Sequence, residues 1–399
     1  MKYDVIIVGG GIVGLSTAWH LVHQVQGLRV LIVEKERDIA LHQTGHNSGV
    51  IHSGIYYKPG SLRARNCKTG YDLLLDFCER KGVDYDICGK VIVAVDEEEV
   101  ERLEKVYERG VANGLEGIRM ISGAEVREIE PHIEARAGIW VPQTGIVHFP
   151  DVARKMLEDV QSYGGRIRYG ARVTGVTTDG QTVTVKTTDG TFTAGRLINC
   201  AGLYADKIAG MTGDKQRMRI VPFRGEYYRL KPEKTHLIRN LVYPTPNPAF
   251  PFLGVHFTRM IKGGIEAGPN AVLAFAREGY TKTAIHLPEL AETLAFPGFR
   301  RLAKKHWRFG LNEMKRSFSK RRFYESLRRM LPELEMSDIV YYRAGVRAMA
   351  LDDNGEVVDD FIVSVRDNII NVWNAPSPAA TASLAIGRHI VEQTGMVAV

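Results

Sequence analysis

Residues 4–14 read DVIIVGGGIVG, an apolar run that ends in a glycine-rich turn. Gly9, Gly11 and Gly14 have the spacing G-x-G-x-x-G. In this motif the first glycine makes the tight turn after a strand, the second lets the backbone approach a pyrophosphate, and the third packs the next helix against the strand. The segment therefore predicts a dinucleotide site at a helix N-terminus, with Ile12 and Val13 among its contacts.

A second apolar segment, residues 29–33, ends at Glu34, twenty residues after Gly14. A carboxylate at this position binds the hydroxyls of a ribose and would repel a 2′-phosphate, so the ligand is FAD or NAD rather than NADP. We place Glu34 and the neighbouring Lys35 in the cofactor site. The sequence contains no second G-x-G-x-x-G, so nothing indicates a separate nicotinamide site, and FAD is the cofactor we expect.

Length and composition describe a soluble globular protein. The 399 residues are too many for one ordinary domain, and 44% are apolar and 25% charged. The four cysteines form no C-x-x-C pair and no His/Cys cluster has zinc spacing, so we expect reduced thiols and no metal. We see no signal peptide and no run long enough to span a bilayer. We expect a cytoplasmic protein, or one peripheral on the cytoplasmic face of a membrane.

The segment after Glu34, residues 41–57, is rich in Gly, His, Asn, Ser and Thr. Loops at the carboxyl ends of strands are where sheets of this class bind ligands. We expect this loop to fold over the cofactor; a solvated surface loop is the alternative. The contacts expected from it are Thr44, His46, Asn47, Ser48, Gly49 and Val50.

The pattern of apolar residues predicts an α/β fold with two discontinuous domains. A Rossmann-like FAD-binding domain comprises residues 1–85, 148–220 and 339–399. A substrate-binding cap, built on a large antiparallel sheet, comprises residues 86–147 and 221–338, with the ligand site between the domains. Within this plan we expect helices at 61–81, 96–113, 151–164 and 379–392, a meander at 173–193, a separate strand at 196–202, cap strands at 223–230 and 252–259, and a further strand at 341–350 in the FAD-binding domain.

Longer strings resemble one family. Residues 1–34, 198–202 (INCAG) and 344–347 (AGVR) resemble the D-amino-acid-oxidase-like FAD-dependent oxidoreductases. Residues 43–52 (QTGHNSGVIH), 223–227 (FRGEY), 252–258 (FLGVHFT), 268–275 (GPNAVLAF) and 374–381 (NAPSPAAT) are similar to the L-2-hydroxyglutarate oxidase/dehydrogenase family. The resemblance covers essentially the whole chain. It implies bound FAD, oxidation of L-2-hydroxyglutarate to 2-oxoglutarate with hydride passing to flavin N5, and electron transfer to membrane quinone or oxygen.

Residues 374–381 precede the predicted C-terminal helix, whose free N-terminus would stabilise negative charge on a reduced flavin. An ordinary helix entry is the alternative, and the resemblance favours flavin contact. The remaining cofactor contacts that we expect are Val173, Ala201, Gly202, Gly345, Arg347, Pro376, Ser377, Ala379, Ala380 and Thr381.

Oxidising an alcohol requires a base for the hydroxyl proton, and histidine is the usual candidate. His52 lies in the loop expected near the flavin. His256 lies in a predicted strand, where alternation can point it into the cleft. We favour His256 slightly over His52, with His46 third; a structural histidine is the alternative for each.

A five-carbon diacid also needs cationic anchors, and the guanidinium fork binds a carboxylate in two places. Arg347 lies among small apolar residues on a strand that should run beneath the flavin, so we place it in the catalytic site. The expected substrate-binding residues are Arg224, Arg259, Tyr228 and Thr258.

The segment 300–329 carries twelve Lys/Arg against two Glu, whereas the whole chain has a net charge of +7. A solvated helix pair is the simple interpretation; docking on an anionic membrane surface is the functional one. Two other functions stay open: an amine or amino-acid oxidase of the same fold, and a nucleic-acid-binding flavoprotein. The resemblance argues against the first, and no RNA-binding motif supports the second, so we expect no nucleic-acid partner.

Overall fold

The first large sheet is built around the glycine-rich segment. The computed structural model describes residues 2–215, 217–247 and 253–397. β1 (Lys2–Val8) lies between β2 (Val30–Val33) and β12 (Gly190–Asn199), parallel to both. β9 (Arg166–Arg168) and β20 (Ile369–Asn374) add further parallel strands. The antiparallel strands β10 (Val173–Thr178), β11 (Val183–Thr187) and β19 (Ile362–Arg366) complete eight strands.

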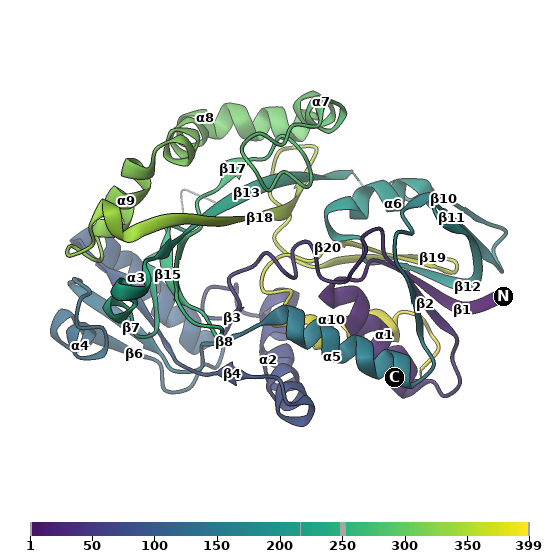
Figure 1. The fold of residues 1–399 in the computed structure, drawn as a ribbon, viewed down its shortest axis with the longest axis horizontal. Helices are drawn as coiled ribbons and strands as arrows, with labels where there is room; N and C mark the ends of the chain where they lie inside the picture. The colour runs from purple at the N-terminus through teal and green to yellow at the C-terminus, as the bar shows by residue number, and fades with distance from the viewer. Residues whose placement is uncertain (1, 216, 248–252, 398–399) are drawn as a thin grey trace.

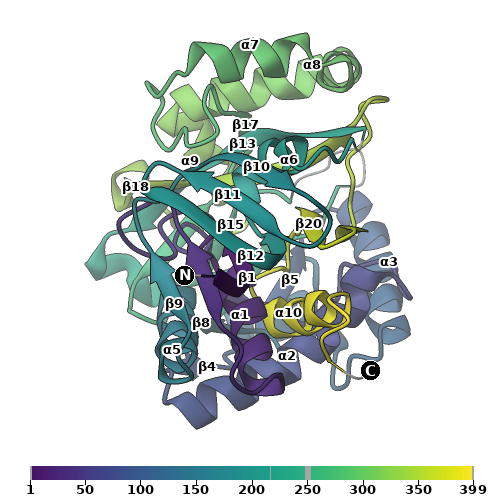
Figure 2. The ribbon, with the colours of Figure 1, turned by 90° about the vertical axis from the view of Figure 1, so that its right-hand side faces the viewer.

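Helices gather on one face of this sheet (Figures 1 and 2). α1 (Ile12–Gln24) packs against α10 (Ser383–Glu392) and α5 (Phe149–Ser162), and α10 also packs against α2 (Leu62–Lys81). Their apolar faces form one core with the strands, in which Leu15, Ile32 and Ile390 are completely buried. Burying each such side chain contributes roughly 1.5–3 kcal/mol. α6 (Ala205–Met211) lies near β20 and β10.

The second large sheet has nine strands. Most pairs are antiparallel, but β5 (Lys90–Ala94) and β14 (Leu241–Pro244) run parallel. β13 (Met218–Leu230) pairs with β18 (Ile339–Asp352) along nearly its whole length, so β18 lies in this sheet although residues 339–399 were assigned with the FAD-binding segments. The other strands are β6 (Arg119–Ser122), β7 (Ala137–Val141), β15 (His256–Arg259), β16 (Ile265–Gly268) and β17 (Val272–Leu273).

The remaining elements cover or join the large sheets. β3 (Val50–Ile51), β4 (Tyr85–Asp86) and β8 (Gly145–Val147) form a small third sheet. α3 (Glu97–Ala112) and α4 (Gly123–Ile129) pack near β5, β6 and β7. Asp96 caps α3, its side chain accepting a hydrogen bond of 2.9 Å from the Glu99 amide. Single 3-10 segments are Gly202–Tyr204, Pro232–Leu237 and Met336–Asp338.

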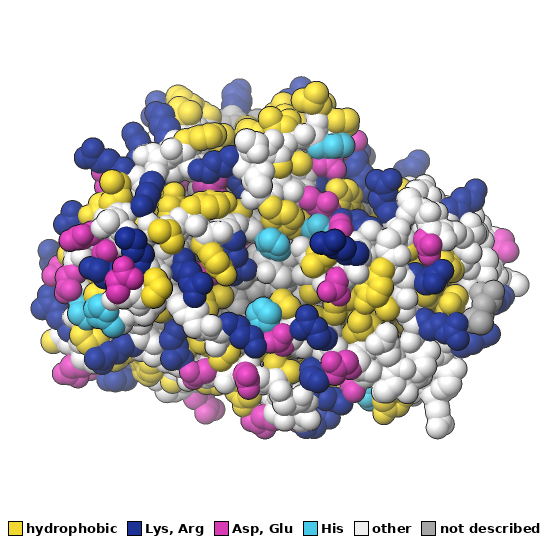
Figure 3. Space-filling model, viewed as in Figure 1, with side chains coloured by type: hydrophobic (Ala, Val, Ile, Leu, Met, Phe, Trp, Pro, Cys, Tyr) yellow, Lys and Arg dark blue, Asp and Glu magenta, His cyan; other side chains and the backbone are white. Residues whose placement is uncertain are grey.

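α8 (Pro297–Phe318) and α9 (Lys320–Arg328) contain the basic segment 300–329, and α7 (Leu287–Ala295), which has no Lys or Arg, precedes them. They lie over the outer side of β13 and β18 (Figure 1). Apolar and basic side chains alternate along the edge formed by α7 and α8 (Figure 3). Trp307, Leu311 and Phe318 are 58%, 47% and 66% exposed, which is unusual for side chains of this size. Among the described residues, no helix combines the length and apolarity needed to cross a bilayer.

Two strand predictions need correction. Residues 190–199 form one strand instead of two, because the first half pairs with β11 while the second half continues beside β1. The strand predicted at 252–259 begins only at His256, and Phe252 lies outside the described residues.

Candidate active site

A cleft of about 1650 Å³ is lined by residues of both large sheets. Val8 and Val173 come from the first sheet, and Tyr227 and His256 from the second. Pockets for a single small ligand usually measure about 300–1,000 Å³. The cleft is therefore large enough for a dinucleotide and a substrate together.

The N-terminus of α1 opens into this cleft. Its N-cap residue Gly11 provides no side-chain cap, and the first turn contains no acidic residue, so the positive end of the helix dipole is not compensated by a carboxylate of that turn. A Cβ on Gly14 would lie 2.1 Å from the Gly9 carbonyl oxygen, whereas one on Gly11 would meet nothing closer than Thr44 Oγ1 at 3.5 Å. Gly14 is thus required by packing, and Gly11 keeps the cleft side of the turn open for a phosphate.

Glu34 lies at the end of β2 and lines the cleft. Its two carboxylate oxygens accept hydrogen bonds of 2.6 Å from the Gly10 amide and 2.9 Å from the Glu36 amide. A carboxylate has about four acceptor positions. These backbone bonds therefore fix its orientation and leave acceptor positions for two ribose hydroxyls.

Most of the predicted cofactor residues line the cleft. Gly14, Gly49 and Thr381 lie behind its wall, where the Thr381 hydroxyl accepts a hydrogen bond of 3.1 Å from the His52 amide. The residues that line it are Gly9, Gly11, Ile12, Val13, Glu34, Lys35, Thr44, His46, Asn47, Ser48, Val50, Val173, Ala201, Gly202, Gly345, Arg347, Pro376, Ser377, Ala379 and Ala380.

His256 begins β15 and lines the cleft at 6% exposure. Its ring stacks on Tyr243, with 3.8 Å between centroids. Nδ1 lies 2.9 Å from the Gly254 carbonyl oxygen, which can only accept, so Nδ1 carries the proton and Nε2 has a free lone pair. Burial, and to a smaller extent the charges of Arg347 and Lys90, lowers the His256 pKa to about 3. The ring is therefore neutral at pH 7, and the negative charge of a bound acid would raise its pKa and make it a stronger base.

The other two candidate bases are also neutral. Burial lowers the pKa of His52 to about 3, with smaller contributions from Lys90 and other cations. Burial also lowers the pKa of His46, whose Nδ1 lies 2.8 Å from the Ala344 carbonyl oxygen. All three histidines line the cleft. The His46 ring packs against the Tyr280 ring, with 4.3 Å between the ring centroids, so His46 is held mainly by contacts within the protein.

Arg347 projects from β18 into the cleft region. Its Nη1 donates a hydrogen bond of 3.4 Å to the Asn270 carbonyl oxygen. Burial lowers the pKa of its guanidinium, but an arginine side chain is not deprotonated in proteins. A permanent cation thus lines the same cleft as the candidate bases.

None of the four predicted substrate-binding residues lines the cleft. Side chains alternate along β13, so Gly225 and Tyr227 face the cleft while Arg224 and Tyr228 face α8 and α9. Arg224 instead pairs with Glu226, at 3.2 Å, and Tyr228 packs against Phe323 with 4.6 Å between rings.

The other two residues lie near the cleft but outside its lining. Arg259 Nη2 pairs with Asp86 at the surface. Thr258 is 1% exposed, and its hydroxyl contacts that of Tyr243. Tyr56, Tyr57, Arg63 and Tyr243 are among the lining residues that the sequence did not single out. Tyr56 and Tyr57 lie in a loop and Tyr243 in the four-residue strand β14, which show no periodicity that could have identified them, and Arg63 lies in the first turn of α2.

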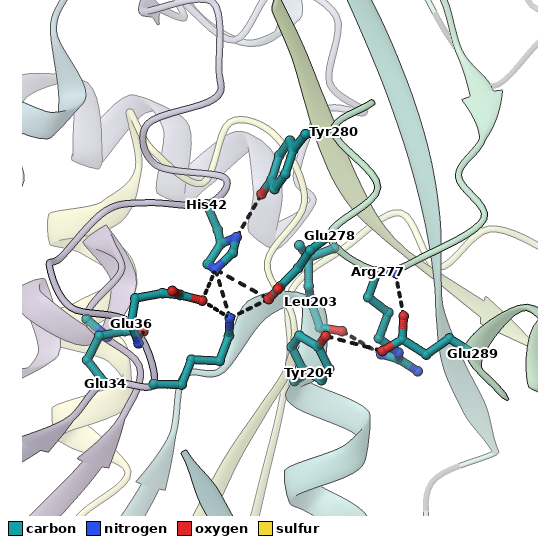
Figure 4. Close-up of polar contacts among 11 residues, drawn as sticks. Glu34, Glu36, His42, Leu203, Tyr204, Arg277, Glu278, Tyr280 and Glu289 are labelled. Atoms are coloured by element: carbon teal, nitrogen blue, oxygen red, sulfur yellow. Dashed lines mark hydrogen bonds and ion pairs between the residues drawn. The ribbon is translucent and has the colours of Figure 1, made fainter. Parts of the chain in front are cut away.

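One polar cluster joins the two halves of the molecule (Figure 4). The Lys35 ammonium forms ion pairs with Glu36, beside the first sheet, and with Glu278, after β17. His42 Nε2 lies 3.1 Å from Glu36 and 3.3 Å from Glu278, and Tyr280 Oη lies 2.9 Å from His42 Nδ1. The three groups Glu36, His42 and Glu278 are near enough to share a metal ion, but the ammonium between the carboxylates already compensates their charge.

Arg277, Glu289 and Tyr204 lie next to this cluster in Figure 4. Arg277 forms a bidentate ion pair with Asp206 of α6, at 2.6 and 2.8 Å. Glu289 accepts hydrogen bonds from the Arg277 amide, at 2.7 Å, and from the Tyr204 hydroxyl, at 3.2 Å. These contacts hold residues 277–289 against the first sheet and so help to close the cleft.

A sequence profile described as "FAD dependent oxidoreductase" matches residues 4–393. The chain belongs to this family. It is 50% identical over 393 residues to L-2-hydroxyglutarate dehydrogenase of Indibacter alkaliphilus, covering 98% of each chain. It is 45% identical to the Escherichia coli K12 protein of the same name, covering 98% of this chain and 93% of that one. Among solved structures it is similar to L-alpha-glycerophosphate oxidase from Mycoplasma pneumoniae with FAD bound (TM-score 0.82, 25% identity, covering 99% and 95%).

The predicted α/β fold with a Rossmann-like FAD-binding sheet is confirmed, and FAD is the cofactor of this family. The residues present fit it: the α1 N-terminus suits a diphosphate, Glu34 suits a ribose, and the turn is open at Gly11. The protein is an oxidoreductase that acts on a small molecule.

Proposed function

We propose that this protein oxidises L-2-hydroxyglutarate to 2-oxoglutarate. The observation that carries the proposal is a single cleft that has the features of an FAD site at one end and two neutral histidines with Arg347 at the other. Relatives 45–50% identical over nearly the whole chain bear the name L-2-hydroxyglutarate dehydrogenase, which supports this substrate. FAD, when bound, supplies the acceptor for the hydride that leaves the hydroxyl-bearing carbon.

His256 is the base in this proposal, with His52 as the alternative. The Nδ1 proton of His256 is donated to the Gly254 carbonyl oxygen, and the stacked Tyr243 ring fixes the plane of the imidazole. Nε2 can then accept the hydroxyl proton of the substrate without any prior loss of a proton. Such proton transfer accelerates a reaction by roughly 10²–10⁴-fold.

Arg347 binds the carboxylate next to the reacting carbon. Its guanidinium can donate two parallel hydrogen bonds to a carboxylate, which orients as well as binds. Arg347 and His256 line the same cleft and interact electrostatically, so both groups can contact one substrate. The walls of the cleft, including Tyr227 and Tyr243, limit the access of water.

A substrate panel tests this function. The FAD-loaded enzyme should reduce a dye acceptor with L-2-hydroxyglutarate at a rate at least about a hundredfold above that with D-2-hydroxyglutarate, glycine, sarcosine or L-proline. Faster turnover of an amine than of any hydroxy acid would contradict the proposal and revive an amine oxidase.

For the electrons we propose transfer to membrane quinone, with oxygen as the slower acceptor, after docking on anionic lipid. Helical spacing places Trp307, Leu311 and Phe318 on one side of α8, away from the buried Glu313 and Ser317. The basic residues Lys304, Arg308 and Lys315 flank this exposed apolar stripe. An exposed apolar face bordered by Lys and Arg is typical of helices that lie in the interface of anionic membranes.

Co-sedimentation with vesicles tests the docking. The protein should pellet with phosphatidylglycerol vesicles at low salt, less with phosphatidylcholine, and less at high salt. The double variant Lys304→Glu/Arg308→Glu should lose most of this binding, whereas Arg154→Glu/Lys155→Glu on α5 should keep it. Absence of pelleting at low salt would contradict the docking, and salt-sensitive binding to RNA alone would assign the basic surface to nucleic acid.

A further inference from the structure

Lys90 is a buried cation at the start of β5. Its side chain is 1% exposed. Its ammonium lies 4.6 Å from the centre of the Tyr56 ring and 5.1 Å from the centre of the Tyr243 ring. Both tyrosines line the cleft, and the Tyr243 ring stacks on His256. Lys90 is not itself a lining residue; it lies directly behind Tyr56 and Tyr243, whose rings separate its ammonium from the cleft.

The charge of Lys90 is poorly compensated. Within the described part of the chain, no hydrogen bond or ion pair joins its ammonium to a carboxylate, and the Cys67 thiol is the ionisable neighbour that favours its charged form. Burial accordingly lowers the pKa of Lys90 to about 7. Aromatic faces attract an ammonium, but they replace only part of the hydration lost on burial. An anion beside Lys90 would stabilise the charged lysine.

The groups around Lys90 also suit an anion. Lys90 acts together with Arg63 on the pKa of His52 and together with Arg347 on that of His256, so this part of the cleft is cationic. The Tyr56 hydroxyl is buried and has no hydrogen-bond partner among the described residues. A buried hydroxyl without a partner is unfavourable, and a carboxylate can accept from a hydroxyl and an ammonium at once.

We propose that Lys90 and Tyr56 form the subsite for the distal carboxylate of the substrate, the one remote from the reacting carbon, and that this carboxylate reaches the Lys90 ammonium between the Tyr56 and Tyr243 rings. Arg347 holds the other carboxylate, and both cations act electrostatically on His256. Lys90 is then the residue that selects a dicarboxylic hydroxy acid over a monocarboxylic one. This inference rests on the proposed function for its substrate, but dicarboxylate binding by Lys90 can be measured without turnover.

Calorimetric titration of the FAD-loaded protein with glutarate and with pentanoate tests the subsite. The two acids differ only in the distal carboxylate. The wild-type protein should bind glutarate more tightly, and Lys90→Met should weaken glutarate binding roughly 30-fold or more while changing pentanoate binding less than about threefold. Lys155→Met, on the surface of α5, should leave both affinities unchanged. The ratio of kcat/KM for L-2-hydroxyglutarate over L-2-hydroxypentanoate should fall in parallel.

Lys90→Gln and Tyr56→Phe provide the same measurement if Lys90→Met fails to retain FAD. Each should reduce the preference for glutarate, Tyr56→Phe by about tenfold. A preference for glutarate that survives in these variants, or an equal loss for both acids, would overturn the subsite. A wild-type protein that prefers glutarate through Lys90 but does not oxidise L-2-hydroxyglutarate would retain the subsite and overturn the proposed function instead.

Discussion

His256 and His52 lie on the same cleft, but the protein controls their rings differently. His256 has one nitrogen bound to a carbonyl oxygen and its ring stacked on Tyr243, so its tautomer and its plane are both fixed. His52 is anchored through its backbone amide, which donates to Thr381, and through its carbonyl oxygen, which accepts from Cys67 Sγ. A base must present a lone pair in a fixed direction, and His256 meets that requirement more fully.

Separate replacement by alanine distinguishes the two histidines. His256→Ala should bind FAD normally and lower kcat with L-2-hydroxyglutarate by at least about a hundredfold, because the hydroxyl proton then has no acceptor. His52→Ala should lower kcat by much less. FAD absorbance and steady-state rates measure both effects. A hundredfold loss in His52→Ala with a mild effect in His256→Ala would reverse the assignment, and mild effects in both would remove it.

Arg347 and Arg259 provide a matched pair of arginines, one inside the cleft and one outside. Arg347→Met should raise the KM for L-2-hydroxyglutarate by roughly 30-fold or more, because a carboxylate loses its bidentate partner. Arg259→Met should change KM less than about threefold, since Arg259 pairs with Asp86 away from the cleft lining. Equal increases in KM for the two variants would show that Arg347 has no special role.

At the scale of elements, two glycines in the turn between β1 and α1 have different roles: Gly14 is required for packing, and Gly11 for cofactor binding. Gly14→Ala would place a methyl group 2.1 Å from the Gly9 carbonyl oxygen, so it should destabilise the fold by several kcal/mol. Gly11→Ala meets no atom within 3.4 Å and should leave the stability of the apo protein within about 1 kcal/mol. Gly11→Ala should nevertheless weaken FAD binding, which flavin fluorescence on titration measures. An apo Gly11→Ala protein that unfolds as readily as Gly14→Ala would contradict this division.

The contact between α1 and α10 makes stability depend on pH. His20 Nε2 lies 2.8 Å from the Leu384 carbonyl oxygen, and burial lowers the His20 pKa from 6.5 to about 4. The unfolded chain therefore takes up a proton near pH 6.5 that the folded chain accepts only near pH 4. The contribution of His20 to the free energy of unfolding is therefore fully present above pH 6.5. It falls by up to about 1.4 kcal/mol for each pH unit as the pH is lowered from 6.5 to 4.

Urea unfolding at pH 7.5 and pH 5.5 measures this effect. His20→Gln keeps a donor for the Leu384 carbonyl oxygen but has no group that titrates in this range. Between pH 7.5 and pH 5.5, the free energy of unfolding should therefore decrease by about 1 kcal/mol less in His20→Gln than in the wild-type protein. An identical pH dependence in His20→Gln and wild type would contradict the account.

The sequence was most informative where an element has a strong period. The unit β1–α1–β2 and the Asp96 cap follow from apolar spacing and cap chemistry, and both are present. The sequence could not predict which side chains of β13 face the cleft. Arg224 and Tyr227 point to opposite sides of the strand, both are plausible substrate contacts, and the strand sequence alone does not show which side is covered by helices. Packing against α8 decides it: Ser317 donates to the buried Glu226, at 2.7 Å, and Glu226 in turn holds Arg224.

Other features of the site have no local signal at all. Lys90 opens a strand and would ordinarily be read as a solvated lysine, yet the fold brings Tyr56 and Tyr243 over it from distant segments. Long-range pairing likewise puts β18 beside β13, more than a hundred residues earlier in the chain. The cofactor end of the cleft was therefore predictable and the substrate end largely was not.

At the scale of the whole molecule, the two large sheets contribute different parts of the site. The first sheet and α1 present the features that fit FAD, and the second sheet presents His256 and Arg347. The Lys35 and Arg277 clusters tie the second half to the first on one side of the cleft. Since the substrate must meet both halves, the reaction depends on residues separated by more than 300 positions in the sequence.

The most direct test of this account is anaerobic addition of L-2-hydroxyglutarate to the purified, FAD-loaded protein. The visible flavin absorbance should bleach within the time of a single turnover, with formation of one 2-oxoglutarate for each flavin reduced. Persistence of the absorbance with L-2-hydroxyglutarate, together with bleaching by an amine or amino acid, would contradict it.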